Sequence, residues 1–286
     1  MASMRDIKRR RSSITSTQQI TKAMKLVSTV KLQKAKGHAE DVSEYFNAMY
    51  RTVCSMLQRV GSISHPYLGE HDKGRPVIIT ITSNRGLAGG YNSNIVKLIA
   101  NSGFEPSETD IFAIGHKGEE MLAHRGYQVI QADNDVMEAP TYEDASRICR
   151  DLLWRFAEGE ISELYLAYTH FKNTVVHEPT LLKLLPVKLD DEEQKAASDD
   201  NLLMNFEPNE EEALEMIIPK YVTSLIYGAL IEAVASENGA RMQAMDSATS
   251  NAEDMISDLT LKYNRARQGS ITQELTEIIA GAEALA

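Results

Sequence analysis

Proline and glycine are almost absent from both ends of this chain of 286 residues. Residues 1–60 contain no proline and only one glycine, Gly37, and no proline follows Pro219. Because these two residue types destabilise a helix interior most, their absence permits very long helices. A helix over residues 209–286 would be several times longer than the mean of about 11–12 residues. Small side chains between Gly228 and Ala248 would let a second helix approach it closely.

Cysteine and long apolar runs are also scarce. Cys54 and Cys149 have no metal-ligand spacing, so we expect reduced thiols in a reducing compartment. No uninterrupted apolar run approaches the roughly 20 residues of a membrane span. The charged start, MASMRDIKRR, lacks the apolar core of a secretory signal. The pattern therefore favours a globular protein without a membrane span of its own.

The sequence shows no cluster of residues suited to catalysis. Its seven histidines are scattered, and no pair has the spacing of metal ligands on a helix. A glycine-rich turn at Arg85–Gly90 follows a β-branched run but lacks both phosphate-binding glycine fingerprints. We therefore expect a structural turn, with no catalytic residue, no cofactor and no metal site. The alternative left open is a nucleotide-dependent α/β protein that uses this turn.

Charge is distributed very unevenly along the chain. Residues 1–36 carry ten basic side chains against Asp6 alone, whereas the whole chain has a net charge of −11. Such polarity suggests either an acidic partner for the N-terminal segment or a solvated helix face. Nucleic acid is a weaker alternative, because the rest of the chain is acidic and lacks an aromatic stacking platform.

The middle of the chain reads as alternating strands and helices. Residues 77–82 form a β-branched run typical of a buried strand, and further short strands are expected at 111–115, 128–130, 164–169 and 181–187. Helices are expected at 92–99, 116–124 and 142–156. This alternation predicts a mostly parallel, Rossmann-like sheet. The acidic segment 190–200 is expected to be a mobile loop or an edge of the domain.

These patterns predict three regions: an N-terminal helix (1–60), an α/β domain (61–208) and a C-terminal helix (209–286). Neither terminal helix can bury its apolar side chains alone, so we expect an antiparallel coiled coil with an inserted α/β domain. The remainder beyond about Asp258 is expected to be unpaired. Ser3 and Asp6 fit an N-terminal capping box. The expected apolar stripe of the first helix, which is not a strict heptad repeat, comprises Met4, Ile7, Ile14, Ile20, Met24 and Val27.

Four stretches together resemble the gamma subunit family of F-type ATP synthases. They are ITKAMKLV (20–27), SNRGLAGGYN (83–92), SENGARMQAM (236–245) and YNRARQGSITQELTE (263–277). The last continues to Ala282 and matches the family signature, which is highly specific. The resemblance covers essentially the whole chain in order.

The resemblance implies a non-catalytic rotor. In that family the paired terminal helices form a shaft inside a ring of alpha and beta subunits. The α/β domain, together with the epsilon subunit, contacts the membrane ring of c subunits. Proton or sodium flow turns this foot, and the asymmetric shaft drives the catalytic sites of the beta subunits. The implied location is the cytoplasmic face of the bacterial cell membrane, peripheral to it through the complex.

The resemblance also implies particular contacts with the beta subunit. Met24 and Lys25 match the shaft position that faces an acidic beta-subunit loop, and Arg241 matches a residue near that contact. Arg267 and Gln268 match residues that engage a second loop. The remaining candidates lie in the C-terminal signature: Thr272, Glu274 and Glu277.

Overall fold

The computed structural model describes residues 4–60, 65–69, 71, 73–187 and 209–285. The chain divides into two compact units, one made of residues 1–28 and 241–286 and the other of residues 29–240. Both terminal helices contribute to both units. The acidic segment 190–200 and Ser3 of the expected capping box lie outside the described residues.

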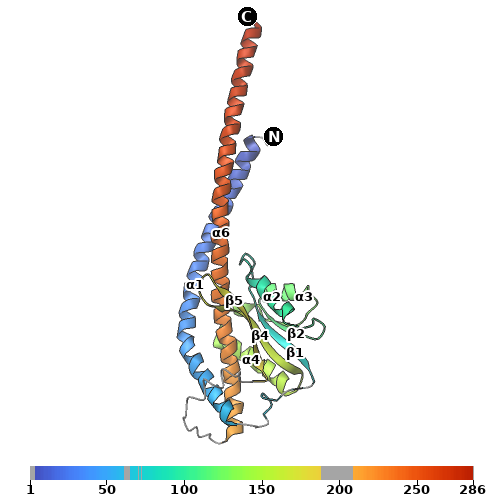
Figure 1. Cartoon of the computed structure of the whole chain (residues 1–286). Coiled ribbons are helices and arrows are strands. Elements are labelled where there is room, and N and C mark those ends of the chain that lie inside the picture. Colours follow the sequence, from blue (N-terminus) through green and yellow to red (C-terminus); the bar gives the residue numbers. More distant parts are fainter. Residues whose placement is uncertain (1–3, 61–64, 70, 72, 188–208, 286) are drawn as a thin grey trace. The chain divides into compact units, whose positions relative to one another are not determined.

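The two terminal helices extend through the regions in which proline and glycine are scarce. Helix α1 spans Met4–Val60 and helix α6 spans Glu210–Leu285, with 57 and 76 residues (Figure 1). Pro219 lies inside α6, close to its start, and the helix continues through it. Asn209 precedes the helix and accepts a hydrogen bond from the Glu212 N–H through its side-chain oxygen at 2.9 Å. An asparagine oxygen in this position satisfies one of the unpaired N–H groups of the first turn.

A five-stranded sheet with the order β3-β2-β1-β4-β5 forms the centre of the second unit. Its first four strands are parallel, and β5 pairs antiparallel with β4. The parallel, Rossmann-like sheet expected from the alternation is therefore confirmed, with an antiparallel strand at one edge. The strands are β1 (Arg75–Ile81), β2 (Asp110–Ile114), β3 (Gln128–Ala132), β4 (Ile161–Phe171) and β5 (His177–Leu185).

Three of the helices between the strands lie within two residues of their predicted limits, and the short helix η1 was not predicted. These helices are α2 (Tyr91–Asn101), α3 (His116–Ala123), the short 3₁₀ helix η1 (Asp135–Met137) and α4 (Tyr142–Ala157). Helix α4 begins with a capping box: Thr141 accepts from the Asp144 N–H, and Asp144 accepts from the Thr141 N–H. The hydrogen bonds from Thr141 lower the pKa of the Asp144 carboxyl.

Two apolar clusters cover opposite faces of the sheet. Ile79 and Phe112 face a cluster that includes the buried sides of α4 and of the first part of α6, whereas Ile78 and Ile111 face α2 and α3. Successive strand residues point to opposite faces, which explains this alternation along β1 and β2. The side chains that α6 buries in the first cluster are Leu214, Ile218, Val222, Ile226, Ala229, Leu230 and Ala233.

Helix α6 also contains a stretch that is long and apolar enough to cross a membrane by composition alone. Half of the most apolar window is buried inside the protein. A helix that contributes to the core of a folded domain has the same composition. The apolar stretch of α6 is accounted for by its packing in the sheet domain.

Candidate partner-binding surface of the paired helices

In the first unit the two terminal helices pair antiparallel. The Arg11 guanidinium lies 5.4 Å from the centre of the Tyr263 ring, and the Gln18 amide donates to Glu253 at 3.0 Å. Further along α1, Thr21 contacts Thr249, and Lys25 forms an ion pair with Asp246. Residue numbers rise on one helix as they fall on the other, which confirms the predicted antiparallel pairing. Because Tyr263 contacts α1, the paired part of α6 extends beyond Asp258, near which it was predicted to end.

The seam positions of both helices are buried or partly buried and have a heptad spacing, although their residues are not a hydrophobic zipper. On α1 the inward positions, at alternating steps of four and three, are Ile7, Arg11, Ile14, Gln18, Thr21, Lys25 and Ser28. On α6 they are Met245, Thr249, Ala252, Ile256, Leu259, Tyr263, Ala266 and Ser270. Sequence reasoning missed this pattern because it searched for apolar residues at heptad spacing, and the α1 side is largely polar.

The predicted apolar stripe of α1 is wrong at Ile20 and Val27. Ile20 and Val27 are 60% and 58% exposed, whereas Thr21 and Ser28 are buried at 8% and 2%. The step from Ile14 to Ile20 is six residues, which turns the helix away from the face that Ile14 occupies. A step of seven residues from Ile14 leads instead to Thr21. The predicted stripe therefore combined residues from two faces of the helix.

Thr21 and Thr249 form the central contact of the pairing. Their hydroxyl oxygens lie 2.7 Å apart, and each hydroxyl also reaches a carbonyl of its own helix, Gln18 at 3.0 Å and Met245 at 2.7 Å. Two protons cannot fill three hydrogen bonds at once. One threonine therefore gives up its bond to its own helix when it donates to the other helix.

The structure places the α1 candidates, Met24 and Lys25, at the edge of the paired surface. Both side chains are partly buried, and the Lys25 ammonium lies 2.6 Å from the Asp246 carboxylate. Lys25 and Asp246 border a surface groove with a volume of about 690 Å3. The groove is lined by Lys22, Lys25, Leu26, Asp246, Ser247, Thr249, Ser250, Asn251 and Glu253. Arg241 is also partly exposed on α6.

The remaining candidates lie near the end of α6, where every described residue from Ile271 to Ala282 is exposed. Arg267 and Gln268 are exposed just before this segment. No described contact joins them to Met24. Intrahelical bonds orient three of the others. Thr272 donates to the Gln268 carbonyl at 2.9 Å, Ser270 to Glu274 at 3.4 Å and Gln273 to Glu277 at 2.9 Å.

The same segment of α6 exposes large apolar side chains. Ile271, Leu275, Ile278 and Ile279 are 49%, 55%, 68% and 60% exposed. Three of them, at 271, 275 and 278, follow each other at steps of four and three and share one face of the helix. A helix with such a face is stable in water only when another surface covers that face.

The glycine-rich turn after β1 uses its polar side chains within the fold. The Ser83 N–H donates to Asn92 at 2.9 Å, and Asn84 donates to the Asn134 carbonyl at 2.6 Å. Asn84 also accepts from the His116 N–H at 3.1 Å. At its tip, Leu87 has a φ of +64° and a side chain that is 64% exposed. These contacts give the turn the structural role that we expected.

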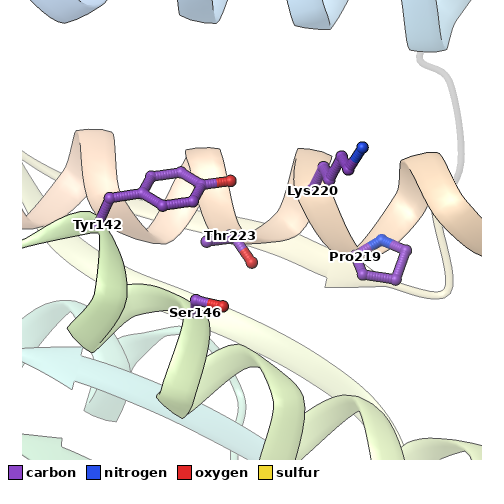
Figure 2. Close-up of a pocket in the computed structure, with 5 residues that line it drawn as sticks. All are labelled: Tyr142, Ser146, Pro219, Lys220 and Thr223. Atoms are coloured by element: carbon purple, nitrogen blue, oxygen red, sulfur yellow. The ribbon is translucent and has the colours of Figure 1, made fainter.

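A groove between α4 and α6 was not indicated by any sequence pattern. Tyr142 and Ser146 of α4 face Pro219 and Thr223 of α6, and Lys220 lies beside them (Figure 2). The groove has a volume of about 540 Å3. Beneath it, the Cys149 thiol donates to the Pro219 carbonyl at 3.6 Å, and burial raises the pKa of this thiol to about 11. Cys149 therefore stays protonated and unreactive at neutral pH.

The comparison with known proteins identifies the family. The ATP synthase family model matches residues 3–285. The ATP synthase gamma chain of Lachnoclostridium phytofermentans is 62% identical to this chain over 290 residues, covering 100% of both proteins. The chain belongs to the ATP synthase gamma-chain family. The fold class and the resemblance inferred from the four sequence stretches are confirmed.

Two further matches are informative about this gamma chain. The gamma chain of Acetobacterium woodii, described as sodium ion specific, is 38% identical and covers 99% of this chain and 98% of its own length. The rotor of the Euglena gracilis mitochondrial ATP synthase is 18% identical with a TM-score of 0.71, covering 94% of this chain and 98% of that one. As a gamma chain, the protein is a non-catalytic central-stalk subunit of the part of the complex that is peripheral to the membrane.

Proposed function

We propose that the paired helices of this gamma chain are a shaft that rotates inside a ring of alpha and beta subunits. In this mechanism the α/β domain is turned by ion flow through the c-subunit ring, with which it and an epsilon subunit make contact. The shaft then forces the catalytic sites of the beta subunits through different conformations. The coupling ion is a proton or sodium ion, and a sodium-specific relative exists at 38% identity.

The observation that carries this proposal is the exposed apolar end of α6. Its isoleucine and leucine side chains have no cover among the described residues, and they lie on a single helix without a partner helix. A ring of other subunits would remove these side chains from water and stabilise the helix. Since few charges interrupt this face, a rotating end would also meet few strong directional contacts.

We assign contacts with the beta subunits to eight residues of the first unit. Met24, Lys25 and Arg241 would face an acidic loop, which fits the strongly basic start of the chain. Lys25 would reach this loop by exchanging its ion pair with Asp246, which is exposed and therefore weak. The other contacts would come from Arg267, Gln268, Thr272, Glu274 and Glu277.

The proposed location is the cytoplasmic face of a bacterial cell membrane. The relatives with the highest identities reported above come from bacteria. The complex would attach the chain to the membrane through the c-subunit ring. Localisation of the tagged chain to inverted membrane vesicles, and its release together with the alpha and beta subunits at low ionic strength, would test this location.

Reconstitution tests the proposed function directly. The isolated chain should have no ATPase activity, yet it should restore ATP-driven ion pumping to a complex depleted of its gamma subunit. It should also co-purify with three copies each of two larger subunits. Failure to assemble with alpha and beta subunits would contradict the rotor function. Saturable nucleotide binding to the chain, abolished by replacing Gly89 with a bulky residue, would favour the enzyme alternative.

The assignment of Arg267 can be tested by a matched pair of variants. Arg267→Ala should lower ATP synthesis by the assembled complex about tenfold, the effect of losing roughly 1.4 kcal/mol of interaction. Arg265→Ala removes the same charge two residues earlier, on the opposite side of the helix, and should have a much smaller effect. Equal effects of the two variants would mean that charge density, and not a contact of Arg267, determines activity.

A further inference from the structure

The turn end of the β4–β5 hairpin, where Phe171 pairs with His177, contacts one face of α6. Ser236 donates a hydrogen bond to the Thr169 carbonyl at 3.1 Å. Glu232 lies one helical turn earlier, and its carboxylate is 2.6 Å from His170 Nδ1 and accepts from the Phe171 N–H at 3.4 Å. Because residues 232 and 236 are four apart, both contacts lie on the same face of the helix.

His177, the first residue of β5, extends this face by one more turn. A Cβ atom added to Gly239 would lie 2.6 Å from His177 Nε2 and 3.3 Å from its Cε1. Any residue other than glycine would therefore displace the imidazole ring. His177 Nε2 is buried and has no hydrogen-bond partner among the described atoms, so the ring is held by its packing against the helix.

A third element reaches α6 at the same level. The Tyr91 hydroxyl at the start of α2 donates to the Ala233 carbonyl at 3.3 Å. Earlier in α6, the contacts with the domain come mainly from apolar side chains such as Leu214, Ile218 and Val222. Apolar burial is non-directional, so it opposes rotation of a helix about its own axis only weakly. Hydrogen bonds, and the His177 ring packed against Gly239, oppose such rotation more strongly because their geometry is fixed.

We infer that Thr169, His170, His177, Glu232, Ser236 and Gly239 form a joint through which the α/β domain transmits torque to α6. This inference rests on the proposed rotor function. The joint lies at the end of the second unit, since Gly239 is followed by Ala240 and then by the first α6 residue of the other unit. Torque carried from the α/β domain to the paired helices along α6 must pass this point of the helix.

The test uses the assembled ATP synthase with Gly239→Ala in this chain. The ratio of ions pumped to ATP hydrolysed should fall roughly threefold or more, while ATP hydrolysis continues. An effect of this size is typical when the interaction between residues in contact is lost. His177→Ala combined with Gly239→Ala removes the collision and should restore the ratio to that of His177→Ala alone. Gly37→Ala is the matched control, because a Cβ atom added to this helical glycine would meet no atom within 4 Å, and it should change nothing.

Two results would overturn the inference: normal coupling in Gly239→Ala, or a double variant no better coupled than the single one. If Gly239→Ala does not assemble, Ser236→Ala provides a second test, since it removes one hydrogen bond without a collision. It should lower coupling at normal assembly, and unchanged coupling would overturn the joint. Failure of the rotor function itself is distinguishable, because the complex with the unmodified chain would then show no coupling.

Discussion

The paired helices and the α/β domain are stabilised in different ways. The α/β domain buries large side chains completely, among them Phe112, Phe156 and Ile79. The pairing of the helices instead relies on a narrow seam whose α1 side carries Gln18, Thr21 and other polar residues. A domain of the first kind is stable by itself, whereas a seam of the second kind leaves much of each helix exposed. The difference fits a rigid foot and a shaft that is completed by other subunits.

The largest expected effect is the loss of a buried aromatic ring from the α/β domain. Phe156→Ala should lower the free energy of unfolding by about 3–5 kcal/mol, because the ring is fully buried and packs edge-on against His71. Trp154→Ala on the same helix, at a side chain that is 58% exposed, should change it by less than about 0.5 kcal/mol. Thermal unfolding of the full chain measures both. Similar losses would mean that α4 packs differently.

Leu225→Pro tests whether the two regions share α6 as a structural element. Proline at this position removes a helix hydrogen bond and collides with the preceding turn, at a cost of about 3 kcal/mol or more. Because this part of α6 packs against the core of the sheet domain, we expect loss of the domain's stability and of complex assembly together. Leu225→Ala keeps the backbone bonds and should cost less. Assembly of the proline variant at normal yield would contradict a continuous α6.

The Thr21–Thr249 contact tests the polar nature of the seam. Thr21→Ala should lower stability by about 1 kcal/mol, since it removes one partner of a buried hydrogen bond. The double variant Thr21→Val with Thr249→Val replaces both partners by side chains of the same shape and should be nearly neutral. Hydrogen exchange of the α1 amides in the full chain would show the difference. A double variant less stable than Thr21→Ala would show that the hydroxyl pair, and not packing, holds the helices together.

The smallest expected effect is a dependence of stability on pH from His177. Burial lowers the pKa of its imidazole, so the folded chain binds a proton less readily than the unfolded chain. The contribution of neutral His177 to stability is fully present above the ordinary histidine pKa of about 6.5. It is lost as the pH falls from there towards the lowered pKa of the folded chain. His177→Gln should therefore reduce the loss of Tm between about pH 7.5 and 5.5. Burial also lowers the pKa of His65. His65 is present in the unmodified chain and in the His177→Gln variant, so it serves as an internal reference.

Much of the fold could be predicted from local patterns. The β-branched run before Thr82 and the capping residues Thr141 and Asp144 determine nearby structure without distant contacts. The part of α6 that packs in the sheet domain was assigned to a separate helical region. Its apolar residues are compatible with both a coiled coil and a domain core, so only the position of the sheet distinguishes the two.

The beta-subunit contacts inferred from the family motifs stay a prediction. Those motifs indicated Arg267 and Gln268, and the structure shows that both side chains are exposed. The motifs did not indicate that Lys25 is paired with Asp246, since the pair joins residues far apart in the chain. The reason for Gly239 within its motif was also hidden, because it depends on the position of His177 across the hairpin.

The sequence by itself determined the two long helices, the alternating α/β region and the gamma-chain family. Helix-breaking residues, β-branched runs and short motifs act locally and can be read without the fold. Only the tertiary structure decided that Thr21 and Ser28, and not Ile20 and Val27, face the second helix. The inward face of a helix depends on its rotation against a partner, and many weak contacts along the whole pair set that rotation together.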